Sequence, residues 1–203
     1  MATGIIKGQF AHVVGTFDLA QRGGTIDYVT PVGTATESAD LEDQGIHLVG
    51  EDAAGNKLFE KPVNPQRNSC APHAQRGTFE EFVPVSPQLN KIRLVIGEST
   101  AAEFRRGAQA TAAAISFGAQ LPDAPHRLSL SPTGVAAAIS GISYTVQAKP
   151  ADAPHWQTLA VGLPTPHAEI DVNQFPGSKS VEVRVMKSDG FTEDEVFRDT
   201  KNF

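Results

Sequence analysis

Strict alternation of apolar and polar side chains near the C-terminal end constrains the fold more than any other feature. The alternating residues are Val181, Glu182, Val183, Arg184, Val185 and Met186. Successive side chains of a β-strand point to opposite faces, so the valines share one face and the charged residues share the other. β-branched residues also favour strands. The pattern predicts a half-buried strand, and the Ser-Asp-Gly that follows it predicts a turn.

The rest of the chain repeats this organisation in short apolar segments separated by Gly, Pro, Asn and Asp, which is typical of antiparallel all-β folds. The expected strands are residues 4–15, 24–33, 45–52, 57–63, 77–85, 90–99, 142–149, 155–163, 167–175, 180–190 and 191–197. An alanine-rich stretch at 101–141 separates the two groups, with a further strand expected near 111–118. We therefore predict two antiparallel β-sandwich domains in tandem, residues 1–107 and 108–203.

Charge and composition exclude several classes of protein. The 203 residues carry a formal net charge of −6 and no basic stripe, which argues against nucleic acid as a partner. No apolar run is long enough to span a membrane, and the opening residues lack the apolar core of a secretory signal. Cys70 is the single cysteine, so an intrachain disulfide and a cysteine-ligated zinc site are both excluded.

Residues 142–193 carry a recurring set of strand and turn positions: Tyr144, Trp156, Gly162-Leu163, Asp171, Pro176-Gly177-Ser178, Val183-Arg184-Val185 and Ser188-Asp189-Gly190. In these positions the segment resembles the immunoglobulin-like or fibronectin type III-like modules at the C-terminal ends of large exported bacterial proteins, some of them metallopeptidases. The resemblance covers about the last 80 residues. It implies a structural or adhesive accessory role, with catalysis located elsewhere in a longer polypeptide. We expect a non-catalytic spacer, adhesion or protein-interaction region outside the cell or in its envelope, monomeric and without cofactor, whose partner is a cell-surface protein or a polysaccharide.

The remaining chemistry is sparse. His126, His155 and His167 could converge at one end of the second sandwich and serve a metal-dependent hydrolase, although no metal-ligating motif is present. Cys70 and His73 could form a thiolate pair in the loop at 64–77, the loop in which a binding feature is most expected. The acidic turn at 51–56 could offer oxygens to Ca²⁺, but its spacing favours ordinary turn chemistry.

Carbohydrate binding is the alternative function. It would use Trp156, Tyr144 and His155, or the loop at 64–77, although a strand tryptophan in such folds more often packs in the core. Adjacent Glu80 and Glu81 should point to opposite faces and act as solvated edge charges. The spacing of Phe79 and Phe82 indicates a bulge or a shifted strand.

Overall fold

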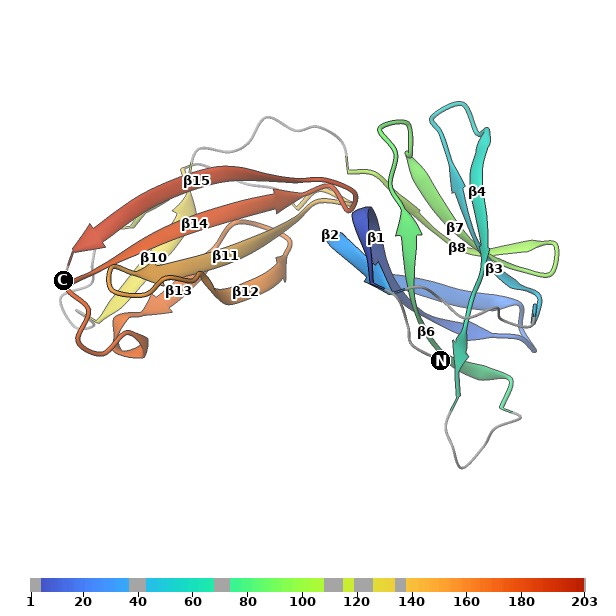
Figure 1. Cartoon of the computed structure of the whole chain (residues 1–203), viewed down its shortest axis with the longest axis horizontal. Coiled ribbons are helices and arrows are strands. Elements are labelled where there is room, and N and C mark those ends of the chain that lie inside the picture. The colour runs from blue at the N-terminus through green and yellow to red at the C-terminus, as the bar shows by residue number, and fades with distance from the viewer. Residues whose placement is uncertain are drawn as a thin grey trace. The chain divides into compact units, whose positions relative to one another are not determined.

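The computed structural model describes residues 5–36, 43–67, 74–107, 115–118, 126–133 and 138–202, and these are almost entirely antiparallel β-structure (Figure 1). The chain divides into two compact units. The first contains residues 1–106 together with Gly190–Thr192, and the second contains Gly107–Asp189 with Glu193–Phe203. The prediction of an all-β fold is confirmed.

The first unit is a sandwich of two four-stranded sheets. One sheet has the order β2-β1-β6-β5 and the other has the order β4-β3-β7-β8. Their bounds are β1 Ile5–Asp18, β2 Gly23–Thr36, β3 Ile46–Glu51, β4 Lys57–Pro62, β5 Pro65–Gln66, β6 Arg76–Pro84, β7 Lys91–Ile96 and β8 Ser99–Arg105. The buried core lies between the sheets and is built from alternate residues of the strands, with Phe79, Ile46, Leu48 and Leu94 among its largest side chains.

The second unit pairs a three-stranded sheet, β13-β10-β9, with a four-stranded sheet, β12-β11-β14-β15. Their bounds are β9 Ile115–Phe117, β10 Arg127–Pro132, β11 Ser143–Pro150, β12 Gln157–Leu163, β13 Ala168–Asp171, β14 Ser180–Ser188 and β15 Glu193–Asn202, with a 3₁₀ turn at Val172–Gln174. Val181, Val183 and Val185 are buried, as the alternation predicted.

Strand order distinguishes the two units. When the seven strands of the second unit are lettered A, B, C, C′, E, F and G in chain order, its sheets read A–B–E and C′–C–F–G. This is the Greek-key order of a fibronectin type III sandwich. In the first unit, the sheet β4-β3-β7-β8 has the same connectivity as C′–C–F–G, but the other sheet places β1 between β2 and β6. The first unit is therefore a sandwich of different connectivity.

Two expectations for β6 need correction. Phe79 and Phe82 lie on an unbroken register with β1, without a bulge; Phe79 faces the core and Phe82 stacks on His12 on the outer face. Glu81 is only 3% exposed and pairs with Lys61, so it is not a solvated edge charge. Lys61 also donates to the Phe82 carbonyl oxygen. β5 pairs with only two residues of β6. The contacts of Lys61 stabilise β6 beyond that pairing, where an unpaired strand edge could otherwise pair with another chain.

Candidate functional site

Trp156 lies directly before β12 on the outer side of the four-stranded sheet of the second unit. Its side chain is half-buried and does not belong to the buried core cluster, so the expectation of core packing is wrong. Instead, three cations lie over the indole ring. The guanidinium carbon of Arg184 is 4.2 Å from the ring centroid, Lys149 Nζ is 5.1 Å away, and the guanidinium carbon of Arg198 is 5.4 Å away.

Sheet register brings these cations together from three strands. Lys149 is on β11, Arg184 on β14 and Arg198 on β15. Arg184 is directly opposite Gln147 on one side and Arg198 on the other. Like charges directly opposite on a sheet repel each other. The pair is tolerated because carboxylates and the negative face of the indole ring surround it.

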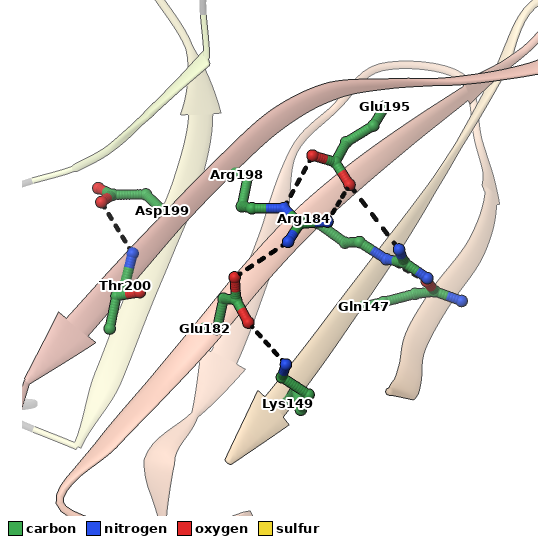
Figure 2. Close-up of polar contacts among 8 residues, drawn as sticks. All are labelled: Gln147, Lys149, Glu182, Arg184, Glu195, Arg198, Asp199 and Thr200. Carbon is green, nitrogen blue, oxygen red and sulfur yellow. Dashed lines mark hydrogen bonds and ion pairs between the residues drawn. The ribbon is translucent and has the colours of Figure 1, made fainter. Parts of the chain in front are cut away.

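Two glutamates link the cations into one network (Figure 2). Glu195 accepts two hydrogen bonds from Arg198, at 2.8 and 2.7 Å, and lies 3.7 Å from Arg184. Glu182 pairs with Lys149 at 3.0 Å and with Arg198 at 3.2 Å. Arg184 Nε also donates to Gln147 at 2.8 Å. The network therefore holds several long side chains in one arrangement.

The electrostatics of the network favour its ionised form. The hydrogen bond from Lys149 lowers the pKa of Glu182, and the hydrogen bonds from Arg198 lower the pKa of Glu195. The same pairing raises the pKa of Arg198. Three cations against two carboxylates leave one net positive charge. Chemically, this is an ordered polar surface with an aromatic centre, and Arg184 occupies a face of the indole ring on which a sugar would otherwise stack.

Arg184→Ala is expected to expose the indole ring and destabilise the second sandwich by about 1–2 kcal/mol, because it removes a stacked cation and a hydrogen bond. Trp156 is the only tryptophan, so its fluorescence reports this site alone. The emission maximum should move to longer wavelength, and the urea midpoint should fall. Arg127→Ala, which breaks an exposed pair with Glu169 in the same unit, is the matched control. An unchanged emission maximum in Arg184→Ala would contradict the stacked arrangement.

The other two predicted ligand residues lie in different surroundings. Tyr144 is 8% exposed and belongs to the core with Val146 and Ala148, on the face of β11 opposite Lys149. Burial raises the pKa of its hydroxyl. His155 is exposed in the loop before Trp156. The three residues therefore do not form one binding surface, because strand alternation turns Tyr144 inward.

The histidines expected to converge are separated by the antiparallel pairing of β10 and β13. His126 precedes β10, next to the end of β13, where its carbonyl accepts from Val172. His167 lies at the other end of this strand pair, 3.0 Å from the Ser131 hydroxyl. Within the described residues, no group of three or more His, Cys, Asp or Glu side chains is placed to hold a metal ion.

The remaining predicted features fall in turns or outside the described residues. In the turn after β3, Asp52 accepts hydrogen bonds from the backbone N–H groups of Ala54 and Asn56, which is turn chemistry. Cys70 and His73 lie outside the described residues. In the part of the chain that the structure describes, no helix has the length and apolarity to cross a bilayer.

Sequence reasoning missed two buried carboxylates, Glu51 and Glu81. Each is bound by basic residues that are distant in the sequence: Glu51 by Lys91 and Arg93, and Glu81 by Lys61. Glu81 has the parity of the buried Phe79 and Val83, which is a signal that could have indicated it. Glu51 has the parity opposite to the core residues Ile46 and Leu48, so its burial depends on pairing with Lys91 and Arg93 and has no such signal.

Comparison with known proteins gives similarity in solved structures only. No family model and no curated protein sequence matches the chain. The FN1–FN3 domains of chicken CNTN1 align over 98% of this chain and 63% of theirs, with 10% identity and a TM-score of 0.35. A two-domain fibronectin type III segment of chicken tenascin aligns over 99% of this chain and 98% of its own, with 13% identity and a TM-score of 0.36. At these scores the fold assignment depends on the strand order.

Proposed function

We propose that the chain is a non-catalytic interaction region of an exported bacterial protein, with the second sandwich presenting a protein-binding face. The observation that carries this proposal is the network around Trp156, on the outer face of a fibronectin type III-like sandwich. The resemblance of residues 142–193 to modules of exported bacterial proteins supports the location outside the cell or in its envelope.

The composition of this face suits protein recognition. Tryptophan and arginine dominate the binding energy of many protein interfaces. Arg184 and Arg198 are already held by Gln147 and Glu195, so a partner would not need to order them. Ordering side chains at an interface costs about 0.5–1.5 kcal/mol for each flexible residue. A face arranged before binding avoids much of this cost.

An immunoblot of cells, envelope and culture medium tests whether the chain is a region of a longer protein and where that protein is located. The chain alone has a mass of 21.5 kDa. A band far above this mass in the medium or envelope is the expected result. A band at 21.5 kDa inside the cell would overturn the proposal. So would hydrolysis of peptides or glycosides by the purified chain, if one substitution abolished it.

A further inference from the structure

A row of neutral polar side chains crosses the outer face of the sheet β2-β1-β6-β5 in the first sandwich. Thr25, Thr16, Thr78 and Gln66 occupy directly opposite positions on β2, β1, β6 and β5, in that order. The hydroxyl oxygens of Thr16 and Thr25 are 2.7 Å apart, which shows that they share a face. Adjacent strands lie about 4.8 Å apart, so the row presents evenly spaced groups that both donate and accept hydrogen bonds.

The row borders a hollow with a volume of about 860 Å³. Gly23 lies in the same wall, and a Cβ built on Gly23 would meet no atom within 4 Å. Ligand pockets commonly enclose about 300–1,000 Å³. The hollow therefore has the volume of a ligand site, and Gly23 leaves it open on the side of β2.

Of the three charged side chains that line the hollow, Asp18 and Arg76 pair with each other, and Arg67 contacts an aromatic ring. Arg76 Nε donates to Asp18 at 2.6 Å, and the Arg67 guanidinium lies over the Phe17 ring. The Gln21 backbone N–H, and then Arg76, lower the pKa of Asp18, so this carboxylate stays ionised and paired. An anionic ligand would have to compete with Asp18 for Arg76. Arg67 Nε has no hydrogen-bond partner among the described residues, so it can donate to an oxygen of a ligand, and a sugar hydroxyl can accept this bond.

The same face continues along β1 with apolar and aromatic groups and with Glu80, which lies opposite Val14 and is 2.8 Å from His12. Val14 lies opposite Tyr28, and His12 lies opposite Phe82. The rings of His12 and Phe82 stack with centroids 5.0 Å apart and an interplanar angle of 19°. The side chains of Val14, Tyr28, His12 and Phe82 are half-buried. A polar row beside an aromatic strip matches a ligand with both hydroxyl groups and apolar C–H faces.

We propose that this face of the first sandwich binds a neutral glycan, with Thr16, Thr25, Thr78 and Gln66 bonding its hydroxyl groups over the hollow beside Gly23. An added peptide strand would pair at an edge of this sheet, beside β2 or β5, and would not lie over the row on its face. The proposed glycan site does not include Trp156. It also does not depend on whether the chain is part of a longer protein or on where that protein is located.

Gly23→Val tests the site by filling the hollow, since its side chain meets open space. Gly33→Val is the matched control, because it adds the same side chain to the same strand where a Cβ also meets nothing within 4 Å. A second variant, Thr16→Val/Thr25→Val/Thr78→Val, removes the hydroxyls while preserving shape. Thr200→Val, at an exposed position of β15, is its control.

The measurement is retardation of the whole chain in native gels that contain soluble neutral or anionic polysaccharides, with co-sedimentation for insoluble ones. We expect binding to at least one neutral polysaccharide, with the affinity at least about tenfold weaker in Gly23→Val and in the triple variant. Both controls should bind as the unmodified chain does. Binding to no polysaccharide, binding to anionic ones alone, or undiminished binding by Gly23→Val would each overturn the proposal.

Discussion

Glu51→Gln is expected to lower the free energy of unfolding of the first sandwich by about 2–3 kcal/mol at neutral pH. Glu51 is 6% exposed at the end of β3. It lies 2.7 Å from Lys91 Nζ and accepts a hydrogen bond of 2.7 Å from Arg93 Nε. The amide would leave both cations without their counter-charge. Because Lys91 and Arg93 retain some access to water, the cost should fall below that of a fully buried pair, about 3–5 kcal/mol.

The same carboxylate makes this effect depend on pH. The hydrogen bond from Lys91, followed by that from Arg93, lowers the pKa of Glu51. The pKa of a glutamate side chain in an unfolded chain is about 4.3. A lowered folded pKa means that the stabilisation is complete above that value and is lost as the pH falls through the folded pKa. The difference between Glu51→Gln and the unmodified chain should therefore shrink in acid.

Hydrogen-exchange mass spectrometry in increasing urea can assign the loss to the first sandwich, through peptides that cover β3 and β7. Glu103→Gln is the control, because it breaks an exposed pair with Arg105 in the same sheet. Exposed pairs contribute about 0–1 kcal/mol. Equal losses in the two variants would contradict the structural role of Glu51, as would a difference that persists unchanged at pH 3.

Periodicity was sufficient to predict the class of fold and the faces of individual strands. Val181, Val183 and Val185 point inward because an alternating strand on a sandwich has one buried face, and the same rule places Tyr144 in the core with Val146. The rule acts within a strand, so it needs no knowledge of neighbouring strands. Tyr144 therefore faces the core and does not contribute to the outer face, where the predicted ligand site would need its ring.

Features that depend on register could not be predicted in this way. Lys149, Arg184 and Arg198 meet over Trp156 only because β11, β14 and β15 pair side by side with one particular alignment. A shift by one residue would send each side chain to the other face. The threonine row of the first sandwich has the same origin, since Thr16, Thr25 and Thr78 are separated in the sequence. The order β2-β1-β6 is also a property of pairing and has no local signal.

Gly15→Ala is expected to destabilise the first sandwich by about 3 kcal/mol, the upper end of the usual cost of overpacking. A Cβ on Gly15 would lie 2.6 Å from the Phe79 ring and still closer to the Thr25 carbonyl oxygen. Phe79 is buried in the core, and Thr25 is held by its pairing with Thr16. Because β1 is paired on both sides, the backbone has little room to relax.

Gly33→Ala separates this steric effect from the general consequence of replacing a glycine. Gly33 lies on β2, where a Cβ would meet nothing within 4 Å, so its replacement should be neutral or stabilising by about 0.4–1 kcal/mol through the unfolded chain. Chemical denaturation followed by circular dichroism, with exchange of β1 peptides as a local readout, compares the two variants. Similar midpoints for Gly15→Ala and Gly33→Ala would contradict the close approach of β1, β2 and Phe79. A large loss confined to Gly15→Ala would mean that the central position of β1 in its sheet requires a residue without a side chain at this point.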